Sequence, residues 1–182
     1  MYPLLIESLI NSPIVKKGEY NYFVHPVTDG IPFISPSLMR EITRGIIRLM
    51  DLKDVDYIVT AEAMGIPIGT SLSLITDIPL NIIRKRRYTL PGEYDVSQVT
   101  GYSKGEMFIN GIKEGDRIVI IDDVISTGGT MNAVITAMNR IGAEIRDICF
   151  VIKKGSPSLS IPYKYLVSIE VAESVKILDQ ST

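Results

Sequence analysis

Short apolar runs rich in β-branched residues recur along the chain, each bounded by acidic residues, proline or glycine. Five of these runs are expected to be strands: 57–60, 80–83, 118–121, 147–152 and 165–169. Because they are apolar at nearly every position, the strands should be buried on both faces, which is typical of a parallel sheet.

Two stretches outside these runs have the periodicity of amphipathic helices. From Pro36 to Met50 the apolar positions keep to one face, with Ser35 suited to the N-cap. From Thr130 to Ile141 a second apolar stripe ends at Gly142, which is a natural helix stop. Alternating strands and helices predict an α/β fold in which a doubly wound, mainly parallel sheet is flanked by helices.

The stretch 86–105, RRYTLPGEYDVSQVTGYSKG, has neither a helical nor a strand period. A connection of about twenty residues within a compact domain is typical of a lid or a binding loop. A surface hairpin without function is the alternative. Since the chain has no repeat and no low-complexity tract, we expect one domain over residues 1–182.

Composition narrows the possible functions. The 182 residues are 46% hydrophobic and 22% charged, and 19 basic against 21 acidic side chains give a net charge of −2. This balance argues against a nucleic-acid partner held by bulk charge. With one histidine, His25, and one cysteine, Cys149, the chain cannot form a Cys/His zinc site, an iron–sulfur cluster or an internal disulfide.

We expect a cytoplasmic protein that makes no membrane contact. No apolar run approaches the ~18 residues of a membrane span, and the amino terminus does not read as a secretory signal. One unpaired thiol also suits a reducing compartment. We expect Cys149 to be a small core residue and His25 to make a structural hydrogen bond.

The segment 118–130, IVIIDDVISTGGT, carries the clearest chemistry. An apolar strand leads through two acids into a turn that opens a helix, whose free N–H groups and dipole favour an anion. The expected phosphate cradle is Ser126, Thr127, Gly128, Gly129 and Thr130. It lacks the lysine of the GxxxxGK[ST] loop, and no GxGxxG follows a first strand.

Two carboxylates next to a phosphate would repel it unless they contact another part of the ligand. Asp122 and Asp123 could accept hydrogen bonds from a vicinal diol, so a ribose 5-phosphate fits the whole segment. An ordinary capped turn with two exposed acids is the alternative.

The same segment resembles the signature of the type I phosphoribosyltransferases, which bind phosphoribosyl pyrophosphate. Residues 83–86 and 90–92, together with GGTMNAVITAMNRIGAEI, resemble the purine branch. The stretches AMGIPIG and TGYSKG are similar to the archaeal-type hypoxanthine/guanine enzymes. The resemblance implies purine salvage: transfer of the phosphoribosyl group to hypoxanthine, and also guanine, with release of pyrophosphate.

The resemblance also implies roles for further residues. Catalysis would rest on Asp122, Asp123 and Lys85, through positioning and electrostatic stabilisation of an oxocarbenium-like transition state. The residues implied at the pyrophosphate are Ala63, Met64, Gly65, Arg84, Lys85, Tyr102, Ser103 and Lys104. Residues 86–108 would form a lid that excludes water. Residues from about 1 to 50 would comprise the first helix and a hood that covers the base.

For the base, a 6-oxopurine needs a hydrogen-bond donor at O6. Lys153 or Lys154 could supply that donor, and Phe33 or Phe150 could stack on the ring.

The alternative substrate is adenine, although Met64 and Gly101 depart from the adenine enzymes. A regulator that senses phosphoribosyl pyrophosphate is an alternative of another class. The family further implies Mg²⁺ carried on phosphoribosyl pyrophosphate, with no protein ligands to the metal, and a homodimer.

Overall fold

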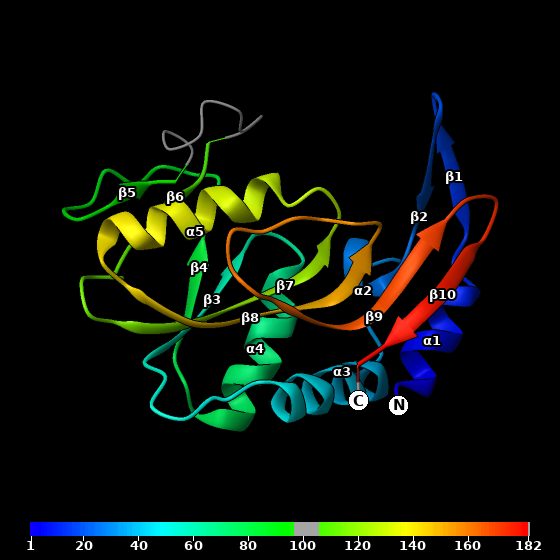
Figure 1. The fold of residues 1–182 in the computed structure, drawn as a ribbon, viewed down its shortest axis with the longest axis horizontal. Helices are drawn as coiled ribbons and strands as arrows, with labels where there is room; N and C mark the ends of the chain where they lie inside the picture. Colours follow the sequence, from blue (N-terminus) through cyan, green and yellow to red (C-terminus); the bar gives the residue numbers. More distant parts are fainter. Residues whose placement is uncertain (97–105, 182) are drawn as a thin grey trace.

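The computed structural model describes residues 1–96 and 106–181. Its centre is a six-stranded sheet with the order β10-β9-β8-β7-β3-β4, in which only β10 is antiparallel to its neighbour (Figure 1). The strands are β3 (Tyr57–Ala61), β4 (Leu80–Ile83), β7 (Arg117–Ile125), β8 (Glu144–Lys154), β9 (Lys164–Val171) and β10 (Val175–Gln180). The predicted α/β fold with a mainly parallel sheet is confirmed.

Helices cover both faces of this sheet. On one face lie α1 (Pro3–Ile10), α3 (Pro36–Leu49) and α4 (Gly65–Thr76), and α5 (Gly129–Ile141) lies on the other (Figure 1). The expected caps are confirmed, since Ser35 Oγ accepts the Leu38 N–H at 3.2 Å and Gly142 ends α5 with φ +86°. The sequence did not predict α1, α4 or β10.

Two short ladders lie outside the main sheet. One pairs β1 (Ile14–Lys17) with β2 (Tyr20–Phe23), and the other pairs β5 (Tyr94–Asp95) with β6 (Phe108–Ile109). β5 of the second ladder lies within the stretch 86–105, which has no clear strand period in the sequence. The one-turn helix α2 (Pro26–Asp29) follows β2.

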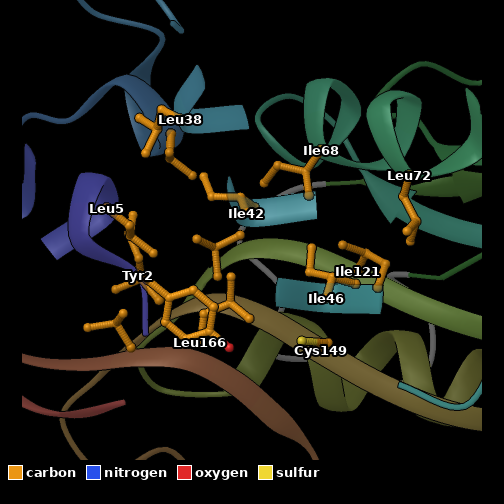
Figure 2. Close-up of a cluster of buried hydrophobic side chains, with 14 of the residues drawn as sticks. Tyr2, Leu5, Leu38, Ile42, Ile46, Ile68, Leu72, Ile121, Cys149 and Leu166 are labelled. Carbon is orange, nitrogen blue, oxygen red and sulfur yellow. The ribbon is translucent and has the colours of Figure 1, made fainter. Parts of the chain in front are cut away.

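Each face of the sheet has its own apolar core. The core beneath α1, α3 and α4 is shown in Figure 2, where side chains from these helices point toward β7, β8 and β9. The labelled members include Leu5, Ile42, Ile46, Ile68, Leu72, Ile121, Cys149 and Leu166. Cys149 is fully buried there, as expected, and burial raises the pKa of its thiol to about 12. Burying these side chains holds the helices in place at about 1.5–3 kcal/mol for each large residue.

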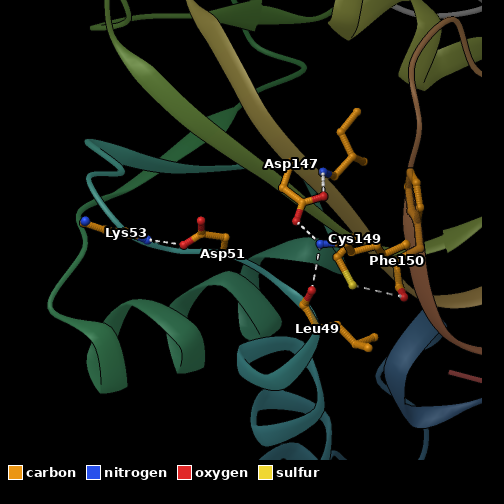
Figure 3. Close-up of polar contacts among 8 residues, drawn as sticks. Leu49, Asp51, Lys53, Asp147, Cys149 and Phe150 are labelled. Carbon is orange, nitrogen blue, oxygen red and sulfur yellow. Dashed lines mark hydrogen bonds and ion pairs between the residues drawn. The ribbon is translucent and has the colours of Figure 1, made fainter. Parts of the chain in front are cut away.

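A polar contact fixes the far end of α3. Lys164 Nζ donates to the Leu49 carbonyl oxygen at 2.7 Å and to Asp147 Oδ2 at 2.6 Å (Figure 3). A cation at the last carbonyls of a helix is favourable because those carbonyls have no partner within the helix. With Ser35 at its start, α3 is therefore tied at both ends. Within the described residues, no helix is long and apolar enough to span a membrane.

Candidate functional site

The carboxyl ends of three neighbouring strands meet at one edge of the sheet. β7 lies between β3 and β8, and all three run parallel. In an open α/β sheet, ligands bind at this edge. The structure thereby brings together the acids of β7, the residues that follow β3, and the turn that leads into α5.

Asp122 and Asp123 lie in the second half of β7, which continues to Ile125. The Asp123 N–H donates to Asp122 Oδ1 at 3.0 Å, and both side chains are partly buried. Burial raises the pKa of both carboxyl groups, and the Asp123 carboxylate raises that of Asp122 further. A pair of desolvated carboxyl groups is suited to bind hydroxyl groups of a ligand.

The turn after β7 has the open geometry expected of a phosphate cradle. Gly128 is the N-cap of α5 and has φ +84°, a conformation that favours glycine. Ser126, Thr127, Gly129 and Thr130 are exposed. Among the described residues, none forms a hydrogen bond with the side-chain hydroxyl of Ser126, Thr127 or Thr130. These hydroxyls and the first N–H groups of α5 are therefore available to an anion.

The segment after β3 packs directly against the acids. A Cβ atom at Gly65 would overlap Thr60 Oγ1 and would lie 2.7 Å from Asp122 Oδ1. Gly65 is also the first residue of α4, so its neighbours Ala63 and Met64 form the approach to that helix. The peptide bond between Glu62 and Ala63 is cis. Gly65 thus lies beside Asp122, and Ala63 and Met64 directly precede it in the chain.

The two cations predicted for the leaving group differ in their surroundings. Arg84 Nε forms an ion pair of 2.5 Å with Glu62 Oε2, and its backbone pairs with Phe108. Lys85 is exposed and has no ion pair within the described part of the chain. The other predicted contacts, Tyr102, Ser103 and Lys104, lie outside the described residues.

The amino-terminal region reaches the same edge of the sheet. Gly30, just after α2, faces Met64, whose Cε would lie 3.8 Å from an added Cβ. The charge of Asp29 contributes to the raised pKa of Asp123. His25 caps α2: its Nδ1 accepts the Val27 N–H at 3.2 Å, and its Nε2 contacts Ser8 Oγ at 2.8 Å. Burial lowers the pKa of His25 to about 4, which suits the structural role expected for it.

The predicted base contacts are not gathered at one point. Phe150 is 1% exposed and packs edge-on against Tyr163, so its ring belongs to the core under α5 and cannot stack on a base there. Phe33 is 68% exposed and borders a groove with α1 and the start of α3. Lys153 Nζ lies 4.7 Å from the Tyr165 ring centre, and Lys154 Nζ lies 5.9 Å from that of Tyr22 in β2.

Two polar side chains near the site were not singled out by the sequence. Glu62 directly precedes the residues predicted at the pyrophosphate, but the sequence gives it no role, because its ion pair with Arg84 depends on the pairing of β3 with β4. Asn132, in the first turns of α5, contacts the loop between β8 and β9. The only signal in the sequence for a role of Asn132 was its position three residues after Gly129 of the cradle.

The donor set gives little support for a resident metal ion. In the ranges 1–96 and 106–181, no three His, Cys, Asp or Glu side chains form a group that could hold one. The two carboxyl groups of Asp122 and Asp123 are better suited to hydroxyl groups than to a complete metal coordination shell.

Comparisons with known proteins identify related sequences. A family model described as a phosphoribosyl transferase domain matches residues 35–179. A hypoxanthine/guanine phosphoribosyltransferase from Methanospirillum hungatei is 74% identical over 181 residues, covering 100% of both chains. A protein of the same name from Methanosphaerula palustris is 54% identical over 180 residues, covering 99% of each.

Solved structures with the same fold are more distant. The adenine phosphoribosyltransferase of Leishmania tarentolae superposes with a TM-score of 0.69 at 18% identity, covering 90% of this chain and 86% of that one. The enzyme of that name from Rhodothermus marinus gives 0.67 at 22% identity, covering 90% and 96%. At these identities the likeness supports the fold alone.

Proposed function

The chain belongs to the phosphoribosyltransferase family, and from this premise we propose that it salvages hypoxanthine and guanine. It transfers the 5-phosphoribosyl group from phosphoribosyl pyrophosphate to the base, giving IMP or GMP and pyrophosphate. The observation that carries the proposal is the partly buried Asp122–Asp123 pair, which lies shortly before an open turn at a helix start. The choice of base rests on the close relatives of that name.

In the proposed reaction a ring nitrogen of the base forms a bond to the anomeric carbon of the sugar. The bond from that carbon to pyrophosphate breaks, and its electron pair leaves with the pyrophosphate. The attacking nitrogen gives up its proton to solvent, so the nucleotide product is neutral at the new bond. The enzyme contributes mainly orientation and a preorganised electrostatic environment.

Each part of the substrate has a place in this proposal. The 5-phosphate occupies the turn at Ser126–Thr130, and the two sugar hydroxyls contact Asp122 and Asp123. Pyrophosphate lies at Ala63–Gly65, where Lys85 offers a free cation. Arg84 joins it when its ion pair with Glu62 opens. Mg²⁺ arrives on phosphoribosyl pyrophosphate as part of the substrate.

The base lies between the sheet edge and the hood. Lys154 is the preferred donor to O6, because its contact with Tyr22 directs it toward the amino-terminal region. Lys153 lies over Tyr165 instead. Residues 86–108 are the proposed lid.

We also propose a homodimer located in the cytoplasm. Support for the dimer comes from exposed apolar side chains of α1, Leu4 at 40% and Ile10 at 53%, next to the groove that Phe33 borders. Support for the cytoplasm is the single buried thiol of Cys149. Light scattering after gel filtration tests the dimer, and a monomer at assay concentration would contradict it.

One assay, run with four bases, tests the function. Purified protein, Mg²⁺ and phosphoribosyl pyrophosphate are mixed with hypoxanthine, guanine, adenine or xanthine, and nucleotide is followed by chromatography. Product from hypoxanthine and guanine alone is expected. Product from adenine alone would assign the adenine reaction, whereas sugar-pyrophosphate binding without product from any base would favour a regulator.

A further inference from the structure

The loop between β8 and β9, residues 155–163, lies against the proposed phosphate cradle. An added Cβ at Gly128 would lie 2.7 Å from the carbonyl oxygen of Ser158 and 3.0 Å from the side chain of Leu159. The loop is therefore in contact with the backbone of the cradle at the residue that caps α5. Any shift of the loop toward or away from α5 changes the space around Gly128.

Asn132 holds this loop from the helix side. Its Nδ2 donates to the Ser158 carbonyl oxygen at 3.0 Å, and its Oδ1 accepts the Ser160 N–H at 3.1 Å. One side chain thus uses both ends of its amide to bind two backbone groups of the same loop. The Asn132 N–H meanwhile donates to the carbonyl oxygen of Gly128 at 2.9 Å, so Asn132 is bonded to the loop and to the cradle together.

A second contact holds the loop from the sheet side. The Tyr163 hydroxyl donates to the Pro157 carbonyl oxygen at 3.1 Å, and its ring packs against Phe150 in the core. Leu159 is partly buried against the same core. The loop is held at both ends and at its middle, although several of its side chains are exposed.

We propose that Asn132 is a positioning residue for the 5-phosphate site. By fixing the β8–β9 loop against Gly128, it holds the turn 126–130 in the conformation in which its N–H and hydroxyl groups converge on the phosphate. The inference rests on the proposed function, because it takes the turn to be the phosphate site. Asn132 acts through the loop and the turn, not by contact with the reacting atoms.

The experiment compares Asn132→Ala with Asn139→Ala, an exposed asparagine two turns further along α5. Ribose 5-phosphate binding is measured by calorimetry, and the KM values for phosphoribosyl pyrophosphate and hypoxanthine are measured separately. Hydrogen exchange of residues 155–163 reports the loop directly.

For Asn132→Ala we expect about tenfold weaker binding of ribose 5-phosphate, the effect of losing one or two hydrogen bonds. The KM for phosphoribosyl pyrophosphate rises by a similar factor, that for hypoxanthine stays within about twofold, and loop protection falls. Asn139→Ala leaves all of these as in the wild type. A general loss of stability would not raise the KM for phosphoribosyl pyrophosphate while leaving the KM for hypoxanthine nearly unchanged.

Unchanged ribose 5-phosphate affinity in Asn132→Ala would overturn the proposal, whether or not the loop loses protection. If Asn132→Ala does not fold, Tyr163→Phe decides by the same measurements, since it removes the other polar contact and keeps the ring in the core. Ribose 5-phosphate binding needs no purine base. A wild-type protein that binds it without turning over any base would therefore contradict the proposed function and leave this inference standing.

Discussion

Gly65 lies so close to Asp122 that a methyl group on its α-carbon would stand 2.7 Å from Asp122 Oδ1. The same methyl group would overlap Thr60 Oγ1, a buried hydroxyl with no hydrogen-bond partner among the described residues. The start of α4 and the acids of β7 therefore occupy one tightly packed unit. A side chain at position 65 must displace either the strand hydroxyl or the carboxylate.

Gly65→Ala is expected to lower kcat/KM for phosphoribosyl pyrophosphate at least about tenfold, because displacement of Asp122 by under 1 Å is costly. It should also lower the melting temperature. Adding Thr60→Ala removes the larger overlap, so the double variant should regain stability while its kcat/KM stays low. Full recovery of activity in the double variant would show that Asp122 is not displaced.

The double variant Asp122→Asn, Asp123→Asn should lose activity but gain stability. Because burial raises both folded-state pKa values, ionising these groups at neutral pH costs folding free energy. The double variant should melt at a higher temperature at pH 7, and the difference should shrink as pH falls and the wild-type carboxyl groups are protonated. Turnover should fall about 100-fold or more, as for loss of preorganised electrostatic groups.

Melting temperatures between pH 4 and 7, together with steady-state rates, test this pair of effects. Retained turnover with unchanged affinity for the sugar pyrophosphate would remove Asp122 and Asp123 from the site.

Lys85→Ala should reduce turnover more than Arg84→Ala. Lys85 is exposed without an ion pair in the described part of the chain, whereas Arg84 is held by Glu62. We expect about a tenfold loss of kcat for Lys85→Ala, equal to about 1.4 kcal/mol of transition-state stabilisation. Arg140→Ala, which changes an exposed arginine in the last turn of α5, is the matched control. Equal losses in all three would indicate a general charge effect.

Glu62→Gln tests the ion pair from the other side. Removing the carboxylate frees Arg84 for the leaving group, so we expect the KM for phosphoribosyl pyrophosphate to fall by about two- to threefold, in line with a modest, partly exposed pair. Product inhibition by pyrophosphate should strengthen by a similar factor. A rise in this KM and in the inhibition constant for pyrophosphate would mean that Glu62 positions Arg84 and does not compete with pyrophosphate for it.

His25 should make stability depend on pH. Its folded-state pKa of about 4 lies below the usual 6.5, so the unfolded chain binds the proton more tightly. The free energy of unfolding keeps its full value above about pH 6.5, and it falls by about 3 kcal/mol as the pH drops toward 4. Protonation at Nδ1 also removes the acceptor for the Val27 N–H.

Urea unfolding at pH 4, 5 and 6.5 measures this loss. His25→Asn, which keeps an N-cap acceptor, should be less stable at pH 6.5 but should lose less on acidification. An equally steep fall in the variant would assign the acid sensitivity to other groups.

Prediction from sequence succeeded where the signal is local. The five apolar runs all lie within strands, and the turn after Asp123 is one continuous motif. It failed for α4, whose sequence GIPIGTSLSLIT has two glycines, a proline and little amphipathic pattern. It also missed β10, a partly exposed edge strand with a register shift at Ile177.

Contacts across the fold could not be predicted in this way. The Glu62–Arg84 pair and the Asn132 contacts join residues brought close only by strand order and loop path. Phe150 was proposed as a base contact, but its side chain lies in the core under α5. A single sequence gives no signal for which face of a doubly covered strand meets the ligand.

The strand order has a consequence for how this protein folds. Tyr57 of β3 pairs with Ile118 of β7, so the two halves of the proposed sugar-pyrophosphate site meet only after a chain segment of about sixty residues has closed. A ligand that bridges both halves binds the native state but not its separated parts, so it should slow unfolding more than it speeds folding. Occupancy by substrate would then act as kinetic protection for the whole sheet.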